Sequence, residues 1–183
     1  ILIHGGNSGI GCAAIQLAKW AGATVICSVR TEEKKNFCEA LGCTSVINIG
    51  KEDFVEYIQE KFPSKINVIL DMIGGDFTEK NLRCLGEYGR LIQIAFLKGQ
   101  FPKVDLMHIM KQRLIITGST LRAKSDKEKK TVADQLKKNI WPEIESGNIK
   151  PCLNKEYQLS EINEAHEFME NSMHMGKIAV TIS

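Results

Sequence analysis

Six short apolar runs, several rich in β-branched residues, alternate with helical patterns along the first two thirds of the chain. The runs predict strands at residues 1–3, 24–29, 46–49, 66–70, 91–95 and 114–117. Between the first two runs, apolar residues recur at helical spacing from Ile10 to Ala21, and Gly22 then ends the predicted helix. Strands that alternate with helices pair in parallel, because each right-handed crossover returns the chain to the same edge. The pattern predicts an α/β fold with a doubly wound, six-stranded parallel sheet.

Three further helices are predicted between the later strands. Thr31 is placed to cap the first of them, and Glu32 and Glu33 suit the positive end of its dipole. The second extends over residues 54–62, and a shorter third one extends over residues 77–85 before Gly86.

The pattern changes after Gly118. A single long, lysine-rich helix is predicted through Val132 and Ile144, followed by a strand near Tyr157, a helix over residues 162–169 and a strand over 178–182. This tail is not another strand-helix-strand repeat, and it is too short to form an independent core. We therefore expect one domain at residues 1–118 and a C-terminal segment at 119–183 that packs on it or on a further domain.

Composition narrows the class of protein. Of the 183 residues, 43% are apolar and 25% charged, which is typical of a globular chain and excludes a disordered or collagen-like one. The net charge of 24 − 22 = +2 is too small to draw the whole surface onto nucleic acid or an anionic membrane. No apolar run reaches the roughly 18 residues that a spanning helix needs. We expect neither nucleic acid nor a membrane as partner.

The six cysteines are not spaced as a zinc site, since Cys38 and Cys43 have no second pair or histidine nearby. We interpret them as reduced thiols and expect a cytoplasmic protein with no metal site in this chain. The chain opens on the strand at Ile1 without a methionine, so we expect further residues to precede it.

A glycine-rich loop separates the first strand from the first helix: Gly6, Asn7, Ser8, Gly9, Ile10 and Gly11. In a Rossmann fold this loop and the helix N-terminus bind the pyrophosphate of a dinucleotide, so we expect residues 1–118 to form a dinucleotide-binding Rossmann domain. Gly6 and Gly11 match the outer glycines of G-x-G-x-x-G, whereas Ser8 replaces the middle one. The alternatives are a methyltransferase loop and a turn without a ligand.

The end of the second strand indicates which dinucleotide is bound. An NAD site has an acidic residue there to hydrogen-bond the ribose 2′-hydroxyl, but here the strand ends Ser28-Val29-Arg30-Thr31. Arg30 and Lys34 are able to neutralise a 2′-phosphate, with Ser28 or Thr31 as hydroxyl donors. The alternative is that both cations are solvated surface charges. We predict NADP, as NADPH, in preference to NAD.

Taken together, several ordered segments resemble the medium-chain dehydrogenase/reductase superfamily, most closely its zinc-free NADPH:quinone oxidoreductase branch. They are residues 1–11 (ILIHGGNSGIG), 70–75 (LDMIGG), 89–97 (GRLIQIAFL), 117–122 (TGSTLR), 164–166 (EAH) and 176–178 (GKI). Members of that family carry a GroES-like catalytic domain before the nucleotide-binding domain. The resemblance implies that the C-terminal segment would complete this missing catalytic domain.

The resemblance also implies roles for individual residues. Residues 6–11 would bind the pyrophosphate and residues 28–34 the adenosine 2′-phosphate; Ala95, Phe96 and Leu97 would line the nicotinamide side, and Lys177 would reach the cofactor from the tail. One departure is Ile49, where the family commonly has a tyrosine beside the adenosine phosphate. No catalytic residue is expected in this chain, because the dihydronicotinamide supplies the hydride. Zinc ligands of related enzymes lie on the other domain.

The expected function is therefore the nucleotide-binding part of an NADPH-dependent oxidoreductase that reduces a quinone, or a similar electrophilic carbonyl or enone. The alternatives are an enoyl reductase of the same superfamily and a non-catalytic NADP-binding sensor or scaffold. Related enzymes join two sheets edge to edge, so we expect a homodimer through the strand at Leu114–Thr117.

Overall fold

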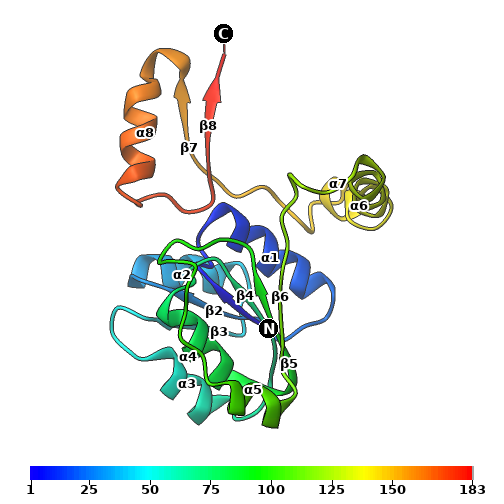
Figure 1. Ribbon diagram of the computed structural model, residues 1–183. Coiled ribbons are helices and arrows are strands. Elements are labelled where there is room, and N and C mark those ends of the chain that lie inside the picture. The colour runs from blue at the N-terminus through cyan, green and yellow to red at the C-terminus, as the bar shows by residue number, and fades with distance from the viewer. Residues whose placement is uncertain (183) are drawn as a thin grey trace.

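The computed structural model describes residues 1–182, and a six-stranded parallel sheet occupies the part up to Gly118 (Figure 1). Its strands are β1 (Leu2–His4), β2 (Ile26–Val29), β3 (Ser45–Asn48), β4 (Ile66–Asp71), β5 (Leu85–Gln93) and β6 (Ile115–Gly118). Their order is β3-β2-β1-β4-β5-β6, with every neighbouring pair parallel. The strand order reverses between β1 and β4, which is where such folds open a ligand crevice. The predicted doubly wound Rossmann sheet is confirmed.

Helices cover both faces of this sheet. On one face lie α1 (Gly9–Trp20) and α2 (Glu32–Ala40); on the other lie α3 (Phe54–Lys61), α4 (Asp76–Cys84) and α5 (Leu106–Gln112). Successive residues of β1 point to opposite faces, so Leu2 packs in the cluster that contains Phe54, and Ile3 packs in the cluster that contains Ile15. The apolar runs of the strands are buried on both sides for this reason.

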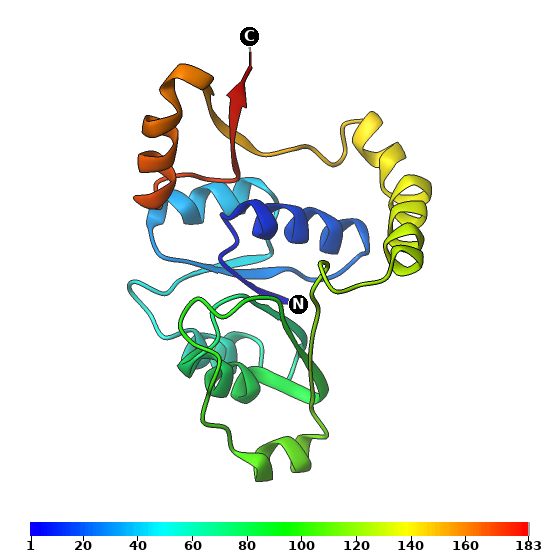
Figure 2. The same cartoon turned by 45° about the horizontal axis from the view of Figure 1, so that its top comes forward.

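The C-terminal segment forms a second, smaller arrangement. It contains α6 (Asp126–Asn139), α7 (Trp141–Glu145), β7 (Leu153–Gln158), a 3₁₀ turn (Leu159–Glu161), α8 (Ile162–Glu170) and β8 (Lys177–Thr181). Strands β7 and β8 pair in parallel as a separate two-stranded sheet. Figures 1 and 2 show this sheet and α8 next to α1 and α2, with α6 and α7 to the side.

Three elements differ from the sequence expectation. The predicted single helix through Val132 and Ile144 is two helices, because Pro142 lies in the first turn of α7 and lacks the N–H that would continue α6. Helix α5 was not predicted, since none of its seven residues is buried. Strand β5 begins at Leu85, which the apolar spacing had assigned to α4.

Candidate dinucleotide-binding site

The glycine loop turns tightly between β1 and α1. Gly5 has φ +65°, in the left-handed region, and its carbonyl oxygen accepts a 2.9 Å hydrogen bond from Ser8 N. Ser8 is the N-cap of α1, and its Oγ accepts a 2.9 Å hydrogen bond from Gly11 N. The serine at the middle glycine position therefore starts the helix, and the helix N-terminus lies beside the loop as an anion site requires.

The outer glycines are required by close packing. A Cβ at Gly11 would overlap the carbonyl oxygen of Gly5, and a Cβ at Gly6 would lie 2.6 Å from Cys27 Sγ on β2. Gly6 N also donates a 3.2 Å hydrogen bond to the carbonyl oxygen of Ser28. The loop is thus packed against itself and against β2, with its backbone open toward the crevice.

A cavity of about 420 Å³ lies over this loop, beside the switch point between β1 and β4. Its walls come from the glycine loop, from the ends of β2 and β3, from the loop after β4 and from the C-terminal segment. The lining residues are Gly5, Asn7, Ser8, Ser28, Val29, Arg30, Lys34, Ile49, Met72, Ile73, Phe77, Leu97, Lys98, Ser172 and His174. The cavity therefore combines an apolar wall with a basic edge.

Arg30 and Lys34 form the basic edge, and no acidic residue lines this cavity. They also line an adjoining cavity of about 610 Å³, which has one acidic residue, Glu33, on its wall. Lys34 is only 8% exposed, and its Nζ donates a 2.6 Å hydrogen bond to the Ser172 carbonyl oxygen. Burial, reinforced by the charge of Arg30, lowers the pKa of Lys34. A buried ammonium with a cationic neighbour favours an anionic ligand.

Ser28 is placed differently from the hydroxyl donor that the sequence predicts. Its side chain is buried, with Oγ 2.7 Å from His4 Nδ1, while His4 Nε2 lies 2.6 Å from Asn81 Oδ1. Asn81 Oδ1 can only accept, so His4 carries its proton on Nε2 and Nδ1 accepts the proton of Ser28. Burial lowers the pKa of His4 and keeps it neutral. The Ser28 hydroxyl already makes its hydrogen bond to His4 inside the fold. Thr31 caps α2, because its Oγ1 accepts a hydrogen bond from Lys34 N.

The C-terminal segment contacts the glycine loop directly. Gly176 N donates a 2.7 Å hydrogen bond to the Asn7 carbonyl oxygen, and Ser8 forms an isolated parallel bridge with Gly176. The Lys177 side chain lies over the start of α1, because a Cβ at Gly9 would be 2.7 Å from Lys177 Nζ. Lys177 therefore reaches the glycine loop from the C-terminal segment, and its contact with a cofactor stays a prediction. Ile10, on the same turn of α1, is half exposed.

His174 is a residue of this site that the sequence did not reveal. Its Nδ1 is buried without a hydrogen-bond partner, although the residue lines the cavity and its carbonyl oxygen accepts from Asn7 Nδ2 at 3.3 Å. Burial and the charges of Lys34 and Lys177 lower the pKa of His174. An unpaired ring nitrogen beside two ammonium groups suits a phosphate. The feature of the sequence that could have pointed to His174 is its position two residues before the motif Gly176-Lys177-Ile178.

The segment after β5 forms the opposite wall. Leu97 lines the cavity, but its side chain is 73% exposed and that of Phe96 is 55% exposed. The carbonyl oxygen of Ala95 accepts a 2.7 Å hydrogen bond from Gln93 Nε2, which fixes the turn out of the strand. Ile49 also lines the cavity and contributes an apolar surface where the family has a tyrosine. This end of the crevice is open to solvent.

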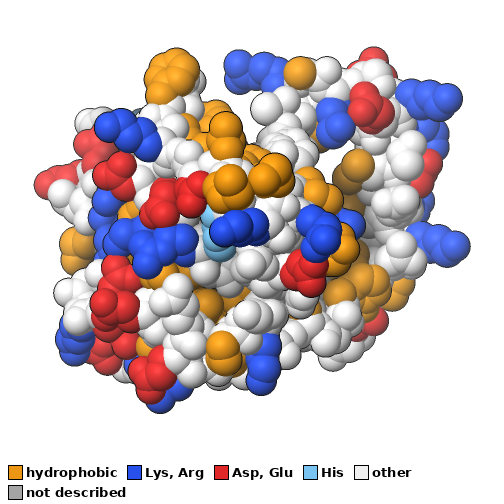
Figure 3. Space-filling view, turned by 60° about the horizontal axis from the view of Figure 1, so that its bottom comes forward, with side chains coloured by type: hydrophobic (Ala, Val, Ile, Leu, Met, Phe, Trp, Pro, Cys, Tyr) orange, Lys and Arg blue, Asp and Glu red, His pale blue; other side chains and the backbone are white. Residues whose placement is uncertain are grey.

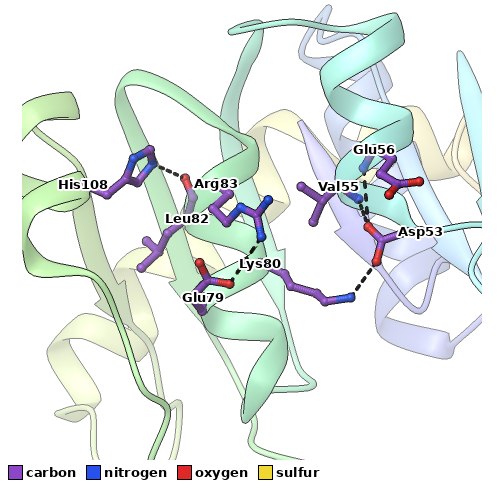
Figure 4. A network of polar contacts seen from close by, with 8 residues as sticks. All are labelled: Asp53, Val55, Glu56, Glu79, Lys80, Leu82, Arg83 and His108. Carbon is purple, nitrogen blue, oxygen red and sulfur yellow. Dashed lines mark hydrogen bonds and ion pairs between the residues drawn. The ribbon is translucent and has the colours of Figure 1, made fainter.

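A second polar cluster on α4 carries charges that are already paired (Figure 4). Lys80 Nζ lies 2.6 Å from Asp53 Oδ2, and Arg83 lies 3.9 Å from Glu79. His108 Nε2 lies 3.1 Å from the Leu82 carbonyl oxygen, in a cavity of about 340 Å³. Because each cation has a carboxylate beside it, this cluster lacks the unpaired positive charge of the dinucleotide site.

Three further observations concern metal ligands, membrane-spanning helices and surface charge. Within residues 1–182, no three histidine, cysteine, aspartate or glutamate side chains gather as a metal site. No helix of the described chain is long and apolar enough to cross a membrane. On the face in Figure 3, basic and acidic side chains are interspersed and form no continuous basic surface.

The fold and the site define a Rossmann dinucleotide-binding unit, and the sequence comparisons identify the family. The model of the zinc-binding dehydrogenase family matches residues 9–138, so the chain belongs to this family. It is 31% identical over 96% of its length to quinone oxidoreductase 1 of Escherichia coli (strain K12), and 29% identical over 98% to 2-haloacrylate reductase of a Burkholderia species. The chain spans 54% of the length of each relative.

The structural comparison agrees. The crystal structure of E. coli quinone oxidoreductase complexed with NADPH superimposes with a TM-score of 0.82 at 28% identity. The match covers 98% of this chain and 56% of that one. The resemblance to the medium-chain dehydrogenase/reductase superfamily is thereby confirmed.

Proposed function

We propose that this chain is the NADPH-binding part of an oxidoreductase that reduces a quinone, or a similar electrophilic carbonyl or enone. The observation that carries the proposal is the pair Arg30, directly after β2, and Lys34, in the first turn of α2, in the region where an NAD site has an acidic residue. The E. coli relative with NADPH and the family membership support the same cofactor and chemistry.

The residues present fit the cofactor. The start of α1 and the Lys177 side chain lie together at the glycine loop, residues 6–11, where they meet the pyrophosphate. Arg30 and Lys34 bind the 2′-phosphate, with His174 beside them on the cavity wall. Ser28 supports this edge through His4 rather than through a direct hydroxyl contact.

When bound, NADPH supplies the hydride, so the protein needs only to orient the nicotinamide and exclude water from it. The turn Ala95-Phe96-Leu97 forms one wall for the ring. With Phe96 and Leu97 more than half exposed, that wall is incomplete in these 182 residues. We assign no catalytic side chain to the chain.

An activated alkene is the second candidate acceptor. It is favoured by the relative named 2-haloacrylate reductase, whose name states a carbon–carbon double bond conjugated to a carboxylate as its substrate. Quinones and acrylates are both electron-poor acceptors of hydride at carbon or oxygen, and the nucleotide site is equally suited to either. A turnover assay that compares the rate of NADPH oxidation with menadione and with 2-chloroacrylate distinguishes the two acceptors.

The test of the proposal has a binding arm and a turnover arm. We expect the 183-residue chain to bind NADPH in a fluorescence titration but to oxidise it with a quinone far more slowly than E. coli quinone oxidoreductase does at equal concentration. We expect slow turnover because the side of the site that would hold the nicotinamide is open to solvent, so water is not excluded from it. Failure to bind NADPH would contradict the proposed cofactor, and turnover equal to that of the E. coli enzyme would contradict the role of the open wall.

A further inference from the structure

Three cysteines from separate segments meet directly beneath the glycine loop. Cys27 lies on β2, Cys38 on α2, and Cys43 in the turn between α2 and β3. The sulfur atoms of Cys27 and Cys43 are 3.5 Å apart. Cys27 and Cys38 are fully buried, whereas Cys43 is half-buried and reachable from solvent, and all three are free thiols. One accessible thiol therefore touches one enclosed thiol.

The surroundings of Cys43 favour its thiolate. Lys19 donates a 3.2 Å hydrogen bond to the Leu41 carbonyl oxygen, and its Nζ lies against Gly42, the residue before Cys43. The hydrogen bond with Cys27 lowers the pKa of Cys43 and the charge of Lys19 adds to this effect, while burial and the charge of Glu39 oppose it without reversing it. Hydrogen bonds with Cys38 and Cys43, together with burial, raise the pKa of Cys27. The more accessible thiol is thus also the one that ionises more readily.

We propose that Cys43 is a site of oxidation by hydroperoxides, and that Cys27 resolves the oxidised Cys43 as an intramolecular disulfide. The Cys43 thiolate attacks the peroxide: a sulfur–oxygen bond forms, the oxygen–oxygen bond breaks, and the departing alkoxide or hydroxide takes a proton from water. The peroxide is reduced by two electrons and Cys43 becomes a sulfenic acid. Cys27 then attacks Cys43 sulfur, and its proton leaves with the hydroxyl group as water.

The position of Cys27 links this chemistry to the glycine loop. A Cβ at Gly6 would lie 2.6 Å from Cys27 Sγ and 3.1 Å from Cys38 Sγ, so these sulfurs form the floor under Gly6. Closing the disulfide draws the two sulfurs together by about 1.5 Å. On the assumption of the proposed NADPH site, this movement alters the support of the pyrophosphate loop and weakens NADPH binding.

The experiment maps thiols after treatment of the reduced chain with hydrogen peroxide. We expect mass spectrometry of the alkylated peptides to find a Cys27–Cys43 disulfide that dithiothreitol reverses. Cys27→Ala is expected to accumulate a Cys43 sulfenic acid that dimedone traps, and Cys43→Ser is expected to form neither product. Cys84→Ala is the matched control, because Cys84 is buried, burial raises its pKa to about 12, and it lies outside the cluster.

A second variant does not disturb the core. Lys19 is exposed, so Lys19→Gln is expected to fold normally and to slow oxidation of Cys43 about threefold to fivefold through the lost charge. Oxidation first at Cys152, the other half-buried cysteine, or persistence of Cys27 and Cys43 as thiols would overturn the proposal. Peptide mapping does not depend on nucleotide binding. A disulfide that forms without changing NADPH affinity would overturn only the link to the loop, and a chain that never binds NADPH would overturn only the proposed function.

Discussion

Lys34 Nζ donates a 2.6 Å hydrogen bond to the carbonyl oxygen of Ser172, so a buried ammonium of α2 is joined to the C-terminal segment at the edge of the cavity. This contact brings residues 138 positions apart to the same phosphate site. The segment after Gly118 therefore contributes to the cofactor site as well as to its own small sheet.

Lys34→Met is expected to weaken NADPH binding about tenfold or more and to change NADH binding little. The reason is the loss of a charge-assisted contact of roughly 1.5 to 3 kcal/mol to the 2′-phosphate. Lys35→Met is the control, since Lys35 is the next residue of the same helix and lines neither cavity. Isothermal titration with both nucleotides measures the difference. Equal losses for NADPH and NADH would show that Lys34 does not contact the 2′-phosphate.

Two alanine substitutions distinguish the role of the loop glycines in packing from their role in NADPH binding. Gly11→Ala places a Cβ against the backbone of Gly5 and Gly6, so we expect it to lower the melting temperature and to abolish binding. Gly9→Ala meets only the flexible side chain of Lys177, so we expect normal stability and weaker NADPH binding. Thermal unfolding and a titration of each variant test this. Gly9→Ala with unchanged affinity would remove Lys177 from the site.

The pH dependence of binding tests His174. Its pKa is lowered in the free chain by burial and by Lys34 and Lys177, and a bound phosphate would raise that pKa. Binding then takes up a proton, so NADPH affinity is expected to rise as the pH falls from 8 toward 6.5. His174→Gln is expected to flatten this slope. The phosphate loses charge only near its pKa of about 6, so equal slopes for the two proteins above that pH would contradict a role for His174.

The exposed edge of the main sheet predicts self-association. Strand β6 is the edge strand of the six-stranded sheet, and Ile115 and Ile116 on it are 45% and 47% exposed. An apolar edge with free backbone groups favours pairing with a second copy across a two-fold axis. Sedimentation at micromolar concentration is expected to give a dimer, Ile116→Lys a monomer, and Leu153→Lys on β7 a dimer. A monomeric unmodified chain would contradict the expectation for Leu114–Thr117.

The sequence was sufficient for the features that depend on local pattern. The six strands follow from apolar runs buried on both faces, and the glycine loop follows from its place between β1 and α1. Contacts between distant residues could not be predicted. The orientation of the Ser28 hydroxyl depends on His4 and, through it, on Asn81, 77 positions farther along. The unpaired nitrogen of His174 likewise depends on how the tail packs against α2.

The cysteines illustrate the same limit. Cys38 and Cys43 are the closest pair in the sequence, yet the contact of 3.5 Å joins Cys43 to Cys27, because β2 and β3 are neighbours in the sheet. The domain boundary at residue 118 and the cytoplasmic location stay predictions.

The choice of cofactor is the central claim, and one paired titration tests it most directly. NADPH and NADH are titrated by fluorescence against the unmodified chain and against Arg30→Asp, in which the new carboxylate repels a 2′-phosphate but is able to accept a hydrogen bond from a free 2′-hydroxyl. We expect the unmodified chain to prefer NADPH, and Arg30→Asp to lose about one to two orders of magnitude in NADPH affinity with little change for NADH. An unmodified chain that prefers NADH, or equal losses for both nucleotides in Arg30→Asp, would contradict the account.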